Sequence, residues 1–108
     1  MAYYMVQAAY TSEAIAAMVK KPEDRGAAIR PVVEKLGGKL VGIWFCFGEY
    51  DVVGISELPD NVSAAAFAFA VSQGGKVKAL KTTPLMTGDE AVNAMKKAGG
   101  AGYRAPGS

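Results

Sequence analysis

Four stretches of the chain have the apolar, β-branched pattern that is typical of strands: residues 2–10, 39–47, 50–58 and 76–85. Both faces of the first stretch are rather apolar, which indicates that both sides of the resulting sheet are covered. The second and third stretches are separated only by a short turn around Gly48, so they are expected to form a hairpin.

A helical pattern follows the first strand and is interrupted once. Thr11 or Ser12 can cap its N-terminus. Lys21-Pro22 interrupts it, because a residue before proline disfavours the α conformation. Pro22-Glu23-Asp24 then suits the first turn of a second helical piece, which ends at Gly37-Gly38. Pro31 lies inside this second piece and removes one backbone donor, so the pattern predicts a first helix that is kinked.

Two further helices are predicted. Pro59-Asp60 ends the third strand and can cap an alanine-rich helix over residues 62–73. The segment 87–90 has the spacing of a capping box and precedes a short helix over residues 91–98. The residues that follow include too few apolar groups to offset their ordering entropy.

The order β-α-β-β-α-β plus a C-terminal helix predicts a ferredoxin-like α+β fold with a four-stranded antiparallel sheet. We expect one domain over residues 1–98 and a flexible Gly-rich tail over residues 99–108. The helices of this fold cover one sheet face, and the other face here would expose large apolar groups. Stacking of two subunits, sheet on sheet, would cover it, so we expect a homodimer or a higher homo-oligomer.

Composition narrows the chemistry. The formal net charge of +2 is too small to indicate nucleic acid or a membrane surface as a partner, and no apolar run approaches the roughly 18 residues of a membrane span. The lone Cys46 cannot form an internal disulfide, and the N-terminus lacks a signal-peptide pattern, so a cytoplasmic location is expected. Phe45 and Phe47 flank Cys46, so we expect its thiol to be buried.

Histidine is absent, and no metal-ligand cluster, phosphate loop or dinucleotide fingerprint is present in the sequence. We therefore predict no metal site and no cofactor, and a triad based on histidine is excluded.

The segment Gly48-Glu49-Tyr50-Asp51 lies between the two apolar central strands. A partly desolvated Asp51 could act as a catalytic base or bind a cation, with Tyr50 orienting the substrate. Alternatively, Asp51 accepts backbone hydrogen bonds from the turn or pairs with a lysine across the hairpin, and Tyr50 is ordinary packing. Gly48 is expected to supply a turn with positive φ.

Three aromatic residues, Tyr4, Trp44 and Phe47, are candidates to line a cavity between the sheet and a partner sheet, where they would suit a small apolar or aromatic ligand. The alternative is that they fill the dimer core. Arg25 could hold an anion or an intersubunit carboxylate, or it could belong to a solvated helix start.

The chain resembles the GYD-domain family over roughly residues 2–95. The resemblance rests on the order of several short motifs: Pro22-Glu23-Asp24-Arg25, Gly37-Gly38, Gly48-Glu49-Tyr50-Asp51, Pro59-Asp60, Gly75-Lys76-Val77 and Lys81-Thr82-Thr83. It implies a ferredoxin-like fold of the dimeric α/β-barrel type, often in higher oligomers. It implies no activity, because fold analogy does not define function.

Three classes of function follow. The first is a homo-oligomeric structural or ligand-binding protein with a pocket at the subunit interface. The second is a cofactor-free isomerase or oxygenase that acts on an aromatic or quinone-like compound, with Asp51 as the base. The third, RNA binding, is disfavoured because the strand that follows Asp51 displays no aromatic or basic residue. The absence of histidine and of a tight catalytic pair favours the first class.

Overall fold

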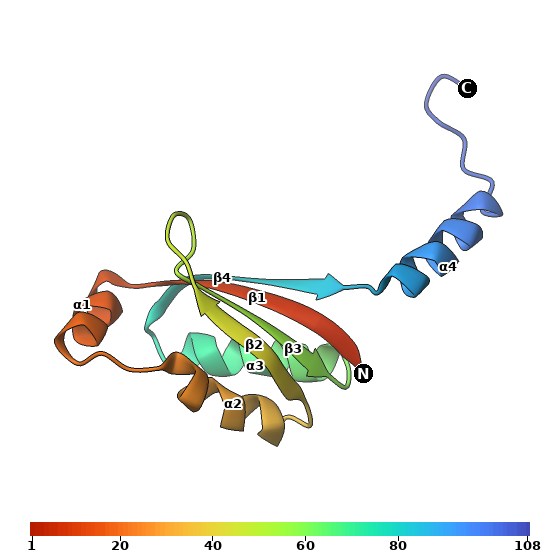
Figure 1. The fold of residues 1–108 in the computed structure, drawn as a ribbon. Coiled ribbons are helices and arrows are strands. Elements are labelled where there is room, and N and C mark those ends of the chain that lie inside the picture. The colour runs from red at the N-terminus through yellow and green to blue at the C-terminus, as the bar shows by residue number, and fades with distance from the viewer.

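The chain folds into four strands and four helices, which the computed structural model describes over all 108 residues (Figure 1). In chain order they are β1 (Ala2–Tyr10), α1 (Ser12–Lys20), α2 (Arg25–Lys35), β2 (Lys39–Phe45), β3 (Val52–Leu58), α3 (Asn61–Gln73), β4 (Val77–Leu85) and α4 (Gly88–Gly99). The strands form one sheet in the order β2-β3-β1-β4, and every neighbouring pair is antiparallel. The predicted ferredoxin-like α+β fold is confirmed.

Two of the four helices, α2 and α3, form a layer on one side of the sheet. Helix α2 packs over β2 and α3 packs over β4, while the opposite sheet face carries no helix (Figure 1). Helix α1 lies beyond one end of the sheet, and α4 extends away from the other end (Figure 1). We call the uncovered surface of the sheet the open face.

The predicted interruption of the first helix is a complete break between α1 and α2. Thr11 caps α1, since its side chain accepts a hydrogen bond from the Ala14 N–H. Asp24 caps α2 and accepts from the Gly26 N–H at 2.9 Å. The expectation that Pro22 to Asp24 form the first helical turn is therefore wrong, because the aspartate acts as the cap and helical geometry begins after it.

A pair of glycines ends α2 and brings the chain back to the sheet. Gly37 has φ 85°, and its N–H donates to the Glu34 carbonyl at 3.0 Å, while the Gly38 N–H donates to the Val33 carbonyl at 3.0 Å. These two bonds form a Schellman motif. A Cβ atom at Gly38 would lie 2.2 Å from the Glu57 carbonyl oxygen, so only glycine allows β2 to start this close to β3.

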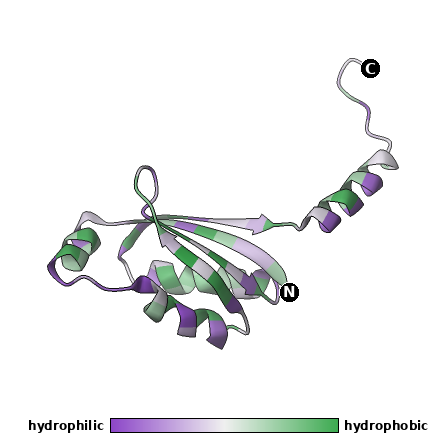
Figure 2. Cartoon of the chain, viewed as in Figure 1, coloured by the Kyte–Doolittle hydropathy of each residue, from purple (hydrophilic) through white to green (hydrophobic).

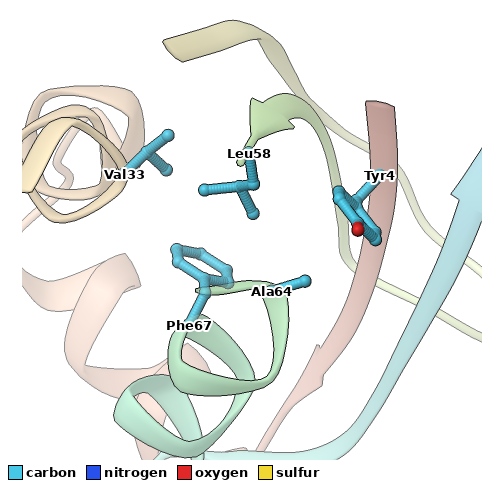
Figure 3. Packing of buried hydrophobic residues seen from close by; sticks show 5 residues of the cluster. All are labelled: Tyr4, Val33, Leu58, Ala64 and Phe67. Carbon is cyan, nitrogen blue, oxygen red and sulfur yellow. The ribbon is translucent and has the colours of Figure 1, made fainter. Parts of the chain in front are cut away.

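The hydrophobic core lies between the helices and one half of the sheet. It joins Tyr4 of β1, Leu58 of β3, Val33 of α2, and Ala64 and Phe67 of α3 (Figure 3). Val33 and Leu58 are the most completely enclosed, at 0% and 1% exposure. Only 12 of the 108 residues are buried, so the core is small. Side chains do not fill all of the space between the sheet and the helices α2 and α3.

The open face of the sheet carries large apolar side chains. Residues alternate between faces along a strand, so Met5 of β1 and the paired Ile55 of β3 lie opposite the helices. Trp44 of β2 pairs with Val53 on this face, is 54% exposed, and lies flat over Gly42, where a Cβ atom would be 2.5 Å from Trp44 Cη2.

The chain exposes more surface than its mass requires. Its accessible area is 7521 Å², whereas a compact monomer of 11.2 kDa exposes about 5,700 Å². Its radius of gyration is 17.4 Å, against about 13 Å for a compact chain of this length. Helix α4 accounts for part of the difference because none of its residues is buried, although it has an apolar side (Figure 2). No helix has both the length and the apolar character that crossing a membrane requires.

Candidate functional site

The connection between β2 and β3 is longer than the sequence predicts. The strands end at Phe45 and begin again at Val52, instead of extending to Phe47 and from Tyr50. Gly48 has φ 125°, which confirms the predicted positive φ. The hairpin itself is confirmed, because β2 and β3 are antiparallel neighbours.

Asp51 ties the base of this hairpin to the end of β1. Its carboxylate Oδ2 accepts a hydrogen bond from the Tyr10 N–H at 2.8 Å, and its own N–H donates to the Ala8 carbonyl at 2.9 Å. Its carbonyl accepts from the Cys46 N–H at 2.8 Å. Of the alternatives weighed for Asp51, a backbone acceptor is the nearest to the arrangement found, but the donor is Tyr10 of β1 and not a residue of the turn. Neither ion pair of the structure includes Asp51.

The predicted aromatic residues do not meet in one place. Tyr4 lies in the helix-side core (Figure 3). Its hydroxyl donates to Asn61 Oδ1 at 2.7 Å. Trp44 lies on the open face, and Phe47 is 98% exposed in the hairpin connection. The expectation that these three line one cavity between stacked sheets is wrong, because Tyr4 and Trp44 occupy opposite faces of the sheet.

The other residues of the turn are less enclosed than predicted. Cys46 is exposed, so the prediction of a buried thiol is wrong. The reason is that β2 ends at Phe45, two residues before the predicted end, so Cys46 belongs to the exposed connection. Its Sγ lies 3.3 Å from the Tyr50 carbonyl oxygen. Tyr50 is half-buried. It lines neither the cavity between the sheet, α2 and α3 nor the depression beside Asp51, both of which are described below.

An apolar cavity of about 290 Å³ lies between the sheet, α2 and α3. Most of its wall is apolar and comes from six elements, all four strands and the helices α2 and α3, with Val6, Ile29, Leu40, Phe67 and Leu80 among the lining residues. Apolar cavities of this size are typical sites for small molecules. It is on the side of the sheet opposite to the open face.

One end of this cavity is cationic. Arg25, Tyr10 and Lys76 line it there, and the same three residues also line a surface depression beside α1, so they stand between the cavity and the solvent. Arg25 Nη1 lies 3.1 Å from Glu23 Oε1, and its Nε–H is buried without a partner. Lys76 pairs with Glu13, and the hydrogen bond and charge of Lys76 lower the pKa of that carboxyl.

Local sequence explains why Arg25 reaches the cavity. It is the first residue of α2 after the Asp24 cap, and Ala28, Ile29 and Val32 follow it at helical spacings of three, four and seven. All four residues line the cavity. The helical spacing of these residues in the sequence could have indicated that Arg25 lies on the face of α2 that is turned toward the sheet.

A second, more open depression of about 340 Å³ adjoins Asp51. Residues of α1 and the α1–α2 connection form one wall, and the strand ends form the other, with Met18, Glu23, Phe45, Cys46 and Asp51 among its lining. No group of three or more histidine, cysteine or acidic side chains is arranged to hold a metal ion.

The fold and the site define a small ferredoxin-like α+β domain with an apolar cavity under its helices. The sequence profile of the GYD domain matches residues 4–95, so the chain belongs to the GYD-domain family, as the motifs indicated. A solved structure described as "crystal structure of FFRP-DM1" is similar in fold, with a TM-score of 0.51 and 12% identity over 80% of this chain and 100% of that one. No curated protein matches the chain.

Proposed function

We propose that this protein is a homodimeric domain that pairs through its open face and binds a small apolar ligand in the cavity beneath α2 and α3. The observation that carries the ligand-binding role is the cavity itself, about 290 Å³ with a mainly apolar wall. The cavity is partly open to solvent, since Ala70 and Lys76 of its lining are exposed. An apolar cleft of this size, in a chain with only 12 buried residues, is a space suited to a ligand.

The unused surface supports the dimer. The chain exposes roughly 1,800 Å² more than a compact monomer of its mass, part of it on α4, and a standard interface buries about 800 Å² per partner. The open face offers apolar groups for such a contact, including Trp44, which is 54% exposed. A second copy of the chain is the partner that carries the same complementary apolar face.

Sedimentation equilibrium at micromolar concentration tests the dimer. The wild type is expected to sediment at twice the mass of one chain. Trp44→Glu places a charge on the open face and is expected to shift the protein toward monomer. Val62→Glu is the matched control, because Val62 is an exposed apolar residue of α3 on the helix side of the sheet. A monomeric wild type, or equal dissociation of both variants, contradicts the dimer.

Titration with 1-octanol, followed by the NMR shifts of backbone amides, tests the cavity. Gly54→Val is designed to fill it, since Gly54 lines the cavity and a Cβ atom there meets only the Gly42 carbonyl oxygen at 3.7 Å. Octanol should perturb the amides around the cavity in the wild type and bind Gly54→Val more weakly. Undiminished binding by Gly54→Val would contradict this location.

A catalytic role for Asp51 is the weaker candidate. The depression beside its carboxylate favours it, because a substrate could reach the carboxylate from there. The hydrogen bond from Tyr10 N–H opposes it, because one carboxylate oxygen already has a structural partner. Tyr50 does not line that depression, so the pair expected to share the chemistry is not assembled there.

A further inference from the structure

We infer that the ligand of the α2–α3 cavity is a small apolar carboxylate whose anionic group binds Arg25, an inference that rests on the proposed ligand-binding role. The two ends of such a ligand would lie in different parts of the cavity. The apolar body lies among the side chains between the helices and the sheet, and the carboxylate lies at the end where Arg25, Tyr10 and Lys76 meet.

The buried Nε–H of Arg25 is the first observation that indicates an anion. It has no hydrogen-bond partner, although a buried donor is nearly always paired in a folded protein. The guanidinium lies at the only part of the cavity wall that carries positive charge. The Nε–H is closed to solvent in this structure, so the side chain must turn toward the cavity before a carboxylate oxygen can supply the acceptor that this donor lacks. Arginine matches the planar geometry of a carboxylate.

The present partner of Arg25 does not satisfy it. Glu23 Oε1 contacts Nη1 at 3.1 Å, and the Glu23 side chain is 50% exposed. An ion pair that is this open to water is weak, so Glu23 can turn into solvent when a ligand enters. The Nε–H stays unpaired in the presence of this contact, which means that Glu23 and a ligand carboxylate use different donors of the same guanidinium.

The second cation adds positive potential at the same end. Lys76 is paired with Glu13 on the surface, and both side chains are more than half exposed. Its charge is therefore largely compensated and screened, which makes Arg25 the principal binding group. With one incompletely paired cation, the site favours a monoanion over a doubly charged phosphate.

The volume sets the size of the ligand. At about 30 Å³ for a water-sized group, a cavity of about 290 Å³ holds roughly ten non-hydrogen atoms. An eight-carbon fatty acid or a phenyl-substituted short-chain acid has about this size. The lining offers few polar groups away from the Arg25 end, and Ser56 is one of them, so a ligand with several hydroxyl groups would be poorly matched.

NMR titrations of the full chain with octanoate and with 1-octanol at pH 7 test the inference. These probes share their apolar body and differ in charge. The wild type is expected to bind octanoate about tenfold or more tightly than octanol, the effect of one charge-assisted hydrogen-bonded contact. Arg25→Gln should lose this preference while its octanol affinity is retained. Arg30→Gln is the matched control, because Arg30 is an exposed arginine of the same helix and does not line the cavity.

The outcomes separate the inference from the function on which it rests. Equal affinity of the wild type for octanoate and octanol, or an octanoate preference that survives in Arg25→Gln, overturns the assignment of the anion to Arg25 and leaves an apolar site in place. If neither probe shifts the amides of cavity residues, the ligand-binding role itself is overturned. Should Arg25→Gln fail to fold, the preference of the wild type between the two probes decides the question.

Discussion

The role of Asp51 leads to a prediction that separates structure from catalysis. Replacing Asp51 with alanine removes the acceptor of the Tyr10 N–H at 2.8 Å, at a half-buried position where water can replace it only in part. Losing a hydrogen bond to a charged group and leaving its donor unpaired costs about 1–3 kcal/mol. Since the site is half-buried, we expect a loss of about 1–2 kcal/mol in the free energy of unfolding.

Urea unfolding at a fixed protein concentration measures this loss, because the stability of a dimer depends on concentration. With a denaturant dependence of about 1–3 kcal/mol per M, the midpoint should fall by roughly 0.5–1 M. Asp51→Asn should lose less, since its amide oxygen can still accept the Tyr10 hydrogen bond. Asp89→Ala is the control, because Asp89 is exposed in the first turn of α4. An Asp51→Ala midpoint equal to that of the wild type would refute the structural role and strengthen the catalytic one.

Three further predictions concern the framework around the site. Leu58→Ala should lower the free energy of unfolding by about 2–5 kcal/mol in urea, because Leu58 is 1% exposed in the core. A loss smaller than that of an alanine substitution at an exposed residue would contradict the burial of Leu58. Gly37→Ala should cost about 1–2 kcal/mol in the same assay, since φ of 85° is unfavourable for a residue with a Cβ atom, and an unchanged midpoint would argue against the Schellman motif. Hydrogen bonds from Ser63, chiefly from its backbone N–H, lower the pKa of Asp60. The ionised Asp60 therefore stabilises the fold fully above the ordinary pKa of 3.8, and this contribution is lost as pH falls through the lowered pKa of the folded state. Thermal melts should therefore show an advantage of the wild type over Asp60→Asn that is present near neutral pH and shrinks in acid, whereas a difference independent of pH would contradict this cause.

Local signals in the sequence were sufficient for the elements of the fold. The apolar pattern predicted β1 with its observed bounds, residues 2–10. Thr11, Asp60 and Thr87 each cap the N-terminus of a helix, as their position in the sequence indicated. These signals work because a cap or a positive φ is set by a few neighbouring residues. The boundaries of β2 and β3 were less predictable, since apolar side chains continue past Phe45 into the exposed connection.

The candidate site depended on features that a linear pattern does not contain. Both faces of β1 are apolar, so the alternation could not decide whether Tyr4 lies beneath the helices or on the open face. The partner of Asp51 is a backbone N–H of Tyr10, 41 positions away, and only the pairing of the strands brings them together. The cavity arises from the gap between α2 and α3, and the inward stripe that begins at Arg25 was its one local sign.

Native mass spectrometry with octanoate tests the central claim most directly, because one spectrum reports both the assembly and the occupancy of the cavity. The proposed homodimeric ligand-binding domain predicts a dimer that carries up to two octanoate molecules, with ligand-bound peaks much reduced in Gly54→Val. A ligand-free monomer as the main species of the wild type at micromolar concentration would contradict the proposal.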